Sequence, residues 1–496
     1  MRDVGLKVRV VEVWYGLKDL RLRLPFRFGV ATLTEAPMLR LGLVVEDAEG
    51  RRAAGRAADL LPALWFDKSP DKPIELKIDD QIEMAAAAAR ISLDFGKKPV
   101  TPFRLSLETL AELKREAAAR GINALTAQFG ASFAERAMID AVCRLAARPF
   151  EGALRTNLFA VEPEAIHPEL KGLDLERVLP EAPLREMWVR HTIGLGDALT
   201  PADLPKGDRL DDGLPETLEE ELATRGLRYF KIKIGADRAW NFARLTGIAR
   251  ILRQRCGTTF RVTLDGNEQV QNLGDLEWLL DRLGNDPDGR VLRRSILFIE
   301  QPLPRERALD PEIAPALAQV NRRCPVIVDE SDDAPDTLAL ARRRGYAGVS
   351  AKNCKGVFKA ALHRALVTVW NERDAGLGRW LVSAEDLSTL PVIPLQEDLA
   401  TIAALGFEHA ERNGHHYFRG LDHLSPRERQ SALESHADLY EVREGLAQVR
   451  IREGRLRLGS IQCPGFGYAS QADDAGFVDV ETWRSAREGR SASGAG

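Results

Sequence analysis

The sequence predicts an α+β domain followed by an α/β barrel, and three observations support this fold class. In residues 1–165, strand-like segments precede helical ones, which is the order of an α+β domain. From about Trp188 onward, short apolar strands alternate with amphipathic helices. No Gly-rich nucleotide-binding fingerprint follows any of these strands, which favours a closed barrel over an open sheet.

The bulk properties of the chain exclude several functional classes. At 496 residues, with 44% apolar and 29% charged side chains, it is long enough for two or three globular domains. The net charge of −4 gives no electrostatic reason to expect nucleic acid as a partner. No apolar run approaches the ~18–20 residues that span a bilayer, and the N-terminus has no signal-peptide core. The five cysteines form no CxxC pair, which predicts reduced thiols and a cytoplasmic location.

The first domain begins with strands and continues with helices. Residues 6–15 alternate as a strand, and residues 38–57 are predicted to form two strands joined by a turn at Asp47–Gly50. Two helices are expected after them. One covers 105–120 and ends at Gly121, and the other opens with a capping box formed by Ser132 and Glu135.

The barrel region, residues 185–445, contains seven segments with the Val- and Ile-rich composition of buried parallel strands. These predicted strands are 186–194, 228–234, 260–265, 295–300, 324–330, 347–352 and 379–385. Helical patterns lie between them at 238–255, 273–284 and 336–345, and the last strand is expected near 413–418. In the C-terminal segment, 446–496, we expect a strand pair, and the last dozen residues are expected to fray.

Charged and polar residues end five consecutive predicted strands. In chain order they are Lys231 and Lys233, Asp265 and Asn267, Glu300, Asp329, and Lys352. Taken singly, each has an ordinary explanation: the lysines of a lone KIK strand usually face water, and an acid after a strand often caps the next helix. In a barrel, however, the carboxyl ends of successive strands converge on one mouth, which is where active sites lie.

Three converging carboxylates predict a cation at this mouth. Like charges held close together are unfavourable unless a proton or a metal intervenes. Carboxylate oxygens without His or Cys ligands suit a hard ion, so Mg²⁺ is expected at Asp265, Glu300 and Asp329. A lysine beside such a cation has a lowered pKa and can accept a proton. Lys233 and Lys352, from strands roughly opposite each other, would then approach a substrate carbon from two faces.

At these residues the chain resembles the enolase superfamily, in particular its mandelate racemase/muconate lactonizing enzyme branch. The matching motifs are KIK at 231–233, LDGN at 264–267, IEQP at 299–302, VDES at 328–331 and SAK at 350–352. The resemblance implies an α+β capping domain and a modified TIM barrel, (β/α)₇β. It also implies metal ligation by Asp265, Glu300 and Asp329, and acid/base roles for Lys233 and Lys352.

The same resemblance assigns supporting roles to further residues. Lys231 would assist by its charge near the substrate carboxylate, and Asn267 would support the metal site. Two capping-domain loops would close the barrel mouth and select the substrate; their counterparts here are 25–34, which contains Phe28, and 59–68, which contains Trp65. Members of the family are commonly homo-oligomers, so a homo-oligomer is expected.

Several features depart from the family pattern or have two interpretations. The sixth predicted barrel strand continues into KNCKGVFK where Gly-Gly is common in the family, and residues 196–221 form an unusual insertion. Glu385 is a candidate substrate contact but could equally be an acid at a helix N-terminus. His416, beside His415, could contact the substrate or be an ordinary hydrogen-bonded histidine.

The leading functional hypothesis is Mg²⁺-dependent removal of the α-proton of a small-molecule carboxylate through an enediolate. Racemisation or epimerisation is the first expectation, because two lysines can serve both faces of the carbon. The alternatives are cycloisomerisation or a syn-elimination like that of o-succinylbenzoate synthase. A binding protein without turnover and a Schiff-base barrel are further alternatives. The substrate itself is not identified by any motif.

Overall fold

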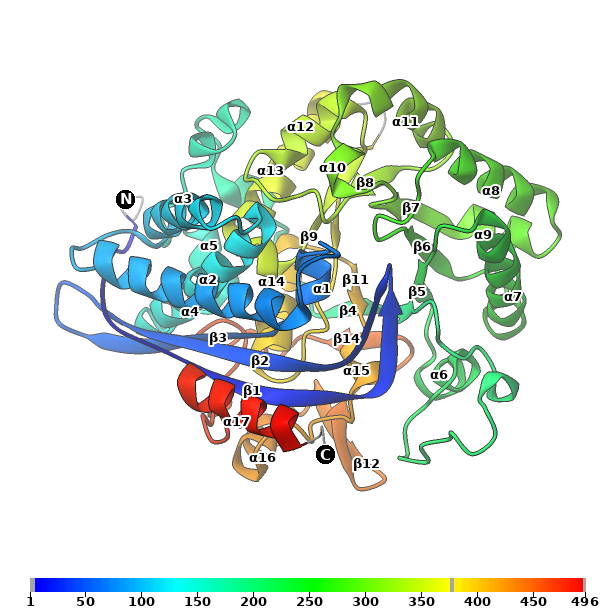
Figure 1. The fold of residues 1–496 in the computed structure, drawn as a ribbon. Helices are drawn as coiled ribbons and strands as arrows, with labels where there is room; N and C mark the ends of the chain where they lie inside the picture. Colours follow the sequence, from blue (N-terminus) through cyan, green and yellow to red (C-terminus); the bar gives the residue numbers. More distant parts are fainter. Residues whose placement is uncertain (1–4, 375–378, 494–496) are drawn as a thin grey trace.

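The computed structural model describes residues 5–374 and 379–493 and shows two regions that pack side by side (Figure 1). The N-terminal region contains an antiparallel sheet in the order β1-β2-β3, formed by β1 (Arg9–Phe28), β2 (Ala31–Glu46) and β3 (Arg52–Leu60). Its helices are α1 (Ala63–Phe66), α2 (Ile74–Phe95), α3 (Pro102–Ala119), α4 (Ala124–Leu145) and α5 (Phe150–Arg155). Helix α4 packs on β3, and α2 and α3 pack on α4.

Helix α4 begins earlier than the sequence predicts. Its N-cap is Asn123, whose side chain accepts a hydrogen bond from the Thr126 amide at 2.9 Å. Ser132 lies inside the helix and donates to the Phe129 carbonyl oxygen, so the predicted capping box is wrong. The cause is that α4 is buried on nearly every side, so no change between polar and apolar faces marks its start.

The second region is a closed barrel of eight parallel strands. They are β4 (Glu186–Ile193), β5 (Tyr229–Lys233), β6 (Arg261–Asp265), β7 (Ile296–Glu300), β8 (Val326–Val328), β9 (Gly348–Ala351), β10 (Leu381–Ala384) and β11 (His409–Arg412). Each pairs with the next, and β11 pairs with β4 to close the ring. The predicted (β/α)₇β fold class is confirmed. The last strand was misplaced, because 413–418 contains the short helix α15 (Gly414–Tyr417), and a four-residue strand with two charged residues gives little apolar signal.

Helices cover the outside of the barrel, with at least one between each pair of strands. They are α6 (Leu218–Arg225), α7 (Arg238–Cys256), α8 (Leu273–Asn285), α9 (Gly289–Ser295), α10 (Arg305–Ala308), α11 (Ala314–Asn321), α12 (Thr337–Arg344), α13 (Val357–Arg373) and α14 (Ile393–Leu405). Short 3₁₀ turns lie at Pro163–Ala165, Pro168–Leu170, Leu175–Val178, Pro201–Asp203, Pro311–Ile313 and Asn353–Lys355. Within the part of the chain that is described, no helix is both long and apolar enough to cross a bilayer.

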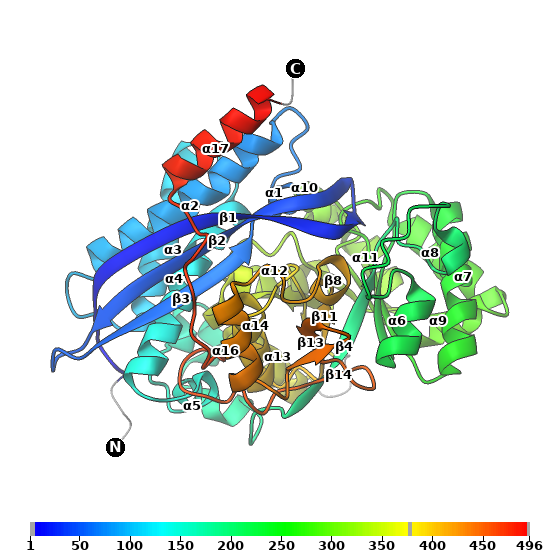
Figure 2. The ribbon, with the colours of Figure 1, turned by 90° about the horizontal axis from the view of Figure 1, so that it is seen from below.

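The C-terminal segment returns to the N-terminal sheet (Figure 2). After α16 (Pro426–Ser435), β12 (Tyr440–Arg443) and β13 (Leu446–Val449) form a hairpin, and β14 (Arg455–Arg457) pairs with the start of β4. Helix α17 (Val480–Ser493) then lies against β1, where Trp483 donates to Asp19 at 2.8 Å. The predicted frayed tail is therefore helical as far as Ser493.

Gly55 lets β3 approach α4 closely. A Cβ atom at this position would lie 2.1 Å from the Ala137 carbonyl oxygen and 2.3 Å from the Ala141 amide nitrogen. Since both are backbone atoms of a buried helix, they cannot move aside without displacing the helix. Gly55→Ala is expected to lower the free energy of unfolding by about 1–3 kcal/mol, measured by urea denaturation. Gly50→Ala, where a Cβ atom meets nothing within 4 Å, tests the strain of a positive φ alone. If Gly55→Ala lowered the free energy of unfolding less than Gly50→Ala does, the steric explanation would be contradicted.

A buried triad joins the two regions. The Arg136 guanidinium on α4 forms an ion pair with Asp59 of β3 at 2.8 Å and with Glu397 of α14 at 3.2 Å. It also donates to the Ala58 carbonyl oxygen. The three charged side chains are at most 2% exposed, so their charges compensate one another with almost no help from water.

Four buried or partly buried histidines make the fold sensitive to acid. Burial lowers the pKa of His363 and His409 to about 3, and that of His423 and His436 to about 4, from 6.5. Between these values and 6.5 the unfolded chain binds more protons than the folded one, so stability is lost as pH falls through this window. We expect the free energy of unfolding to drop by several kcal/mol between about pH 7 and about pH 5. Urea denaturation at the two pH values measures it, and a smaller drop in His436→Gln is the internal control.

Candidate active site

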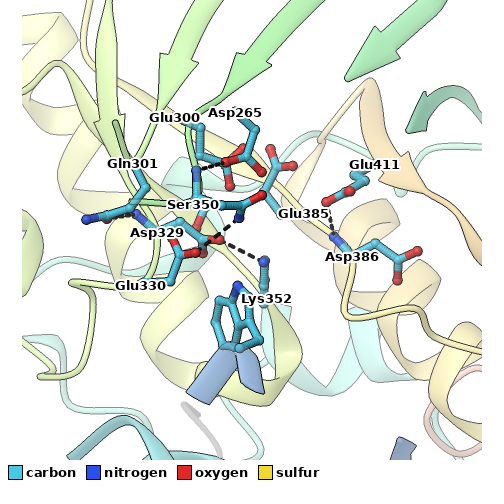
Figure 3. A network of polar contacts seen from close by, with 12 residues as sticks. Asp265, Glu300, Gln301, Asp329, Glu330, Ser350, Lys352, Glu385, Asp386 and Glu411 are labelled. Atoms are coloured by element: carbon cyan, nitrogen blue, oxygen red, sulfur yellow. Dashed lines mark hydrogen bonds and ion pairs between the residues drawn. The ribbon is translucent and has the colours of Figure 1, made fainter. Parts of the chain in front are cut away.

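The predicted strand-end residues converge inside the barrel, with Lys231 at their centre. Register pairs Lys233 with Asp265 across β5–β6 and Asp265 with Glu300 across β6–β7, so these side chains leave neighbouring strands at one level. Figure 3 shows the carboxylates of Asp265 and Glu300 beside each other. The sequence puts them there because each is the last residue of its strand.

The Lys231 ammonium contacts four carboxylates. Its Nζ atom lies 3.0 Å from Asp265, 2.7 Å from Glu300, 2.8 Å from Glu385 and 2.9 Å from Glu411. Burial alone would lower the pKa of Lys231, but the four negative charges reverse the effect and raise it well above its usual value. The side chain is fully buried and does not line the pocket described below. Lys231 is therefore a fixed internal cation in this structure.

Asp329 is held by two lysines at the opposite side of this cluster. Lys352 Nζ lies 2.8 Å from one carboxylate oxygen and Lys355 Nζ lies 3.0 Å from the other, which also accepts from Ser350. Burial opposes ionisation of Asp329, yet Lys352 and Lys355 together hold its pKa well below the usual value. In return, Asp329 outweighs the effect of burial on Lys352 and raises the pKa of that lysine. Lys352 is thus protonated when no other cation lies beside Asp329.

Glu300 is the carboxylate whose charge is least compensated. Its Lys231 contact is an ion pair, and neither carboxylate oxygen has a hydrogen-bond partner among the described residues. Burial, followed by the charge of Glu385, raises the pKa of Glu300 well above its usual value. Glu330 Oε2 and Asn267 Oδ1 nearby also lack hydrogen bonds, although Asn267 Nδ2 donates to Glu330 Oε1 at 3.1 Å. Several oxygen atoms here are therefore free to accept a cation.

The three predicted metal ligands do not yet form one ligand set in this structure. Lysine ammoniums separate them: Lys233 Nζ lies 2.6 Å from Asp265 Oδ2, while Lys352 and Lys355 hold Asp329. Across residues 5–374 and 379–493, the set of three His, Cys, Asp or Glu side chains whose ligand atoms all lie within 4.8 Å of one another is His191, Glu221 and His415. Metal binding at the barrel mouth therefore requires a cation to displace the lysines.

A pocket opens above these charges under a lid from the N-terminal region. It encloses about 380 Å³, counting the part open to solvent. Lys233, Lys352, Asp386, Glu411 and Asn413 form its polar wall; Phe26, Phe28, Leu33, Pro62 and Trp65 are the lid side chains that line it. Figure 1 shows the β1–β2 hairpin reaching toward the barrel mouth. Both predicted loops, 25–34 and 59–68, thus supply lining residues.

The lid is fastened to the barrel by cations. Arg305, which forms an ion pair with Glu268, donates to the carbonyl oxygens of Trp65 and Phe66 at 2.9 and 2.8 Å. Lys68 donates to the Asn267 carbonyl oxygen at 3.0 Å. In the pocket, the Lys352 ammonium lies 4.3 Å from the centroid of the Trp65 ring. The Lys233 ammonium lies 5.9 Å from the centroid of the Phe26 ring, so the lid places an aromatic ring near each pocket lysine.

The four candidate substrate contacts fall in three different environments. Phe28 and Trp65 line the pocket. Glu385 does not; it lies below, bound to Lys231 and to the Arg190 guanidinium of β4. His416 also lies away from the pocket and faces Glu221 at 3.1 Å.

Sequence reasoning missed Glu411 and Lys355, which the structure brings to the site. Glu411 from β11 lines the pocket and accepts from Thr192 at 2.6 Å as well as from Lys231. Lys355 contacts Asp329, and Asp386 lines the pocket but accepts from Thr389 and the Asn413 amide. Glu411 lies in the four-residue strand His409–Arg412 (HAER), and a segment this short is not recognised as a strand from its sequence pattern.

Known structures share this architecture. A dipeptide epimerase from Enterococcus faecalis V583, complexed with Mg and the dipeptide L-Leu-L-Tyr, is 15% identical with a TM-score of 0.58, covering 92% of this chain and 99% of that one. An enolase from Bradyrhizobium, complexed with magnesium and mandelic acid, is 15% identical with a TM-score of 0.55, covering 94% and 96%. A mandelate racemase/muconate lactonizing protein from Herpetosiphon aurantiacus is 20% identical with a TM-score of 0.55, covering 94% and 99%.

Neither a protein-family model nor a curated protein sequence matches the chain. At identities this low the three structures establish a common fold. The resemblance to the enolase superfamily is therefore confirmed at the level of the capping-domain and barrel architecture, which this chain shares along nearly its whole length.

Proposed function

We propose that this chain is an enolase-superfamily enzyme that removes the α-proton of a small carboxylate substrate with the help of Mg²⁺. The observation that carries the proposal is that Lys233 and Lys352 both line one lidded pocket, where Lys233 contacts Asp265 at the end of β6 and Lys352 contacts Asp329 directly after β8. In the described residues these lysines are the cationic side chains of that pocket. This arrangement supports a role for both lysines in exchanging protons with the carbon of a bound substrate.

The donor atoms fit Mg²⁺. Asp265, Glu300 and Asp329 offer hard oxygen ligands, and both Glu300 oxygens lack hydrogen bonds among the described residues. Asn267 supports this side of the site, since its backbone N–H donates to Asp265 Oδ1 at 2.9 Å. When bound, Mg²⁺ would neutralise the substrate carboxylate and stabilise the enediolate that forms as the proton leaves.

The lysines divide into two kinds. Lys233 and Lys352 reach the pocket and hold or deliver protons at Nζ, whereas Lys231 is buried beneath it and compensates Asp265 and Glu300. Because two proton carriers line the pocket, racemisation or epimerisation is the reaction we favour. A syn-elimination or cycloisomerisation needs a single base and would use the same pocket.

The pocket wall suggests the kind of substrate. Its lid is apolar and aromatic, so the group attached near the reacting carbon should be apolar. The polar side offers two ammoniums and the acids Asp386 and Glu411, which suit a carboxylate together with a hydrogen-bond donor. Dipeptides and N-acyl amino acids are therefore the first classes to screen, followed by acid sugars.

The test is exchange of the substrate α-proton with deuterium, followed by proton NMR in D₂O. With Mg²⁺ we expect exchange of at least one compound from these classes, and with a chelator we expect none. A protein that binds Mg²⁺ but exchanges no compound in the panel, while still binding members of it, would identify a binding protein without turnover and refute the proposal.

Glu300→Gln is expected to weaken Mg²⁺ binding by at least about 10-fold, because it replaces an anionic oxygen ligand with a neutral one. Titration of Mn²⁺, followed by electron paramagnetic resonance, measures the affinity. The matched control is Glu385→Gln, since Glu385 is equally buried and contacts the same Lys231 ammonium but is not in the proposed ligand set. If both variants lost the same amount of Mn²⁺ affinity, the total negative charge of the cluster, and not a specific Glu300 ligand, would determine metal binding.

A further inference from the structure

A second group of titratable side chains lies outside the barrel, at the seam where its last strand meets its first. On β4, Arg190 and Thr192 contact Glu385 and Glu411 inside the barrel. His191 stands between them, so strand alternation directs its ring to the opposite side, toward the helix layer. There it meets Glu221 of α6 and His415 of α15.

The three side chains have the spacing of a metal site. His191 Nδ1 lies 3.1 Å from His415 Nε2, and His415 Nε2 lies 3.9 Å from Glu221 Oε2. With metal–ligand bonds of about 2.0–2.1 Å, a tetrahedral ion holds neighbouring ligand atoms about 3.3 Å apart. Small side-chain adjustments would therefore be enough to admit an ion.

The chemistry of the ligands selects the kind of ion. Two imidazoles and one carboxylate form a donor set that is typical of zinc and unlike the all-oxygen set at the barrel mouth. His191 and His415 are buried side chains, and burial lowers the pKa of His191 to about 3, so its ring is neutral. Neutral imidazole nitrogens and an ionised carboxylate are the forms that bind metal.

We propose that His191, Glu221 and His415 form a Zn²⁺ site that pins α6 and α15 across the β4–β11 seam. Three protein ligands leave one coordination position open. His415 and Arg225 also line a pocket of about 490 Å³, counting its open part. His416 Nδ1 contacts Glu221 Oε1 at 3.1 Å and would orient the carboxylate.

Arg225 is the charge that opposes a cation here. Its Nε atom donates to Glu221 Oε2 at 2.6 Å, so zinc must take over this oxygen. The proposal therefore predicts that removing Arg225 tightens zinc binding.

The experiment is zinc binding to the full chain after chelator treatment and dialysis. We expect wild-type protein to bind Zn²⁺ at a site that His415→Ala and Glu221→Gln weaken at least about 10-fold, and Arg225→Met to bind more tightly. Asp329→Asn, which alters the barrel-mouth carboxylates, is the matched control and should keep the site. In wild type, X-ray absorption at the zinc edge should show two imidazole nitrogens.

The result that overturns the proposal is equally specific. Zinc binding that survives in His415→Ala and is lost in Asp329→Asn would place the ion at the barrel mouth. No zinc binding by folded wild-type protein would mean that the three side chains form a hydrogen-bonded cluster only. The absorption measurement uses wild-type protein, so the proposal stays testable even if a variant does not fold. Neither outcome bears on α-proton exchange with Mg²⁺.

Discussion

Lys352→Ala and Lys233→Ala should each abolish exchange of the α-proton from one enantiomer of the substrate while sparing the other. In a racemase each lysine serves one face of the carbon, so each variant retains the base on the opposite face. The affected enantiomer should exchange about 10²–10⁴-fold more slowly, the usual contribution of a positioned proton-transfer group. Proton NMR in D₂O, run on each enantiomer separately with Mg²⁺ present, measures both rates.

The pattern of loss separates the proposed reactions. If Lys233→Ala removes all exchange and Lys352→Ala removes none, a single base acts and elimination or cycloisomerisation becomes the better assignment. Lys359→Met is the matched control. Lys359 is a buried lysine near the start of α13 that pairs with Asp332 at 3.0 Å and does not line the lidded pocket, so wild-type exchange is expected. Mn²⁺ titration of each variant confirms that the metal site remains.

Arg136→Met should destabilise the protein by about 3–5 kcal/mol, because it leaves Asp59 and Glu397 buried without a counter-ion. Urea denaturation measures the loss. The matched control is Arg104→Met on α3, whose ion pair with Glu108 is exposed and should contribute at most about 1 kcal/mol. If the two variants lost the same free energy of unfolding, the buried triad would contribute no more to stability than an exposed ion pair.

The Arg136 variant should also acquire a distinct pH dependence. Burial already raises the pKa of Asp59 from 3.8 to about 7, with Arg136 opposing the rise. Without the guanidinium the folded state binds this proton more tightly than the unfolded chain does, so stability falls as pH rises above 3.8. Wild type shows the same fall up to about pH 7, so the difference between variant and wild type should grow as pH rises above about 7.

Much of the fold and of the candidate site could be predicted, because short apolar strands that end in a single charged residue carry a strong local signal. Asp265, Glu300 and Lys233 illustrate this: each is the last residue of its strand, and register brings them to one level. The resemblance added the capping role of the first domain and the two lid loops, whose Phe28 and Trp65 line the pocket.

What could not be predicted depended on contacts between distant segments. Glu411 belongs to a four-residue strand that is recognisable only because it closes the barrel against β4. Ser132 resembles an N-cap in the sequence. Helix α4 is buried on nearly every side, however, so no change in the pattern of polar and apolar residues shows where it begins. Lys231 resembles a substrate contact by its motif, yet four carboxylates from four strands hold it beneath the pocket.

Glu135 limits how freely the N-terminal domain of this protein can be replaced by that of another protein. Glu135 lies on α4 of the N-terminal region, and its carboxylate accepts hydrogen bonds from the Val357 and Phe358 amides at the start of α13, only a few residues after Lys352. A helix start needs such an acceptor, and here it comes from outside the barrel. A chimera that joins this barrel to a foreign lid domain would lose this acceptor, close to Lys352, for which we propose a proton-transfer role. Specificity in this scaffold is therefore better changed by substituting loop residues than by exchanging whole domains.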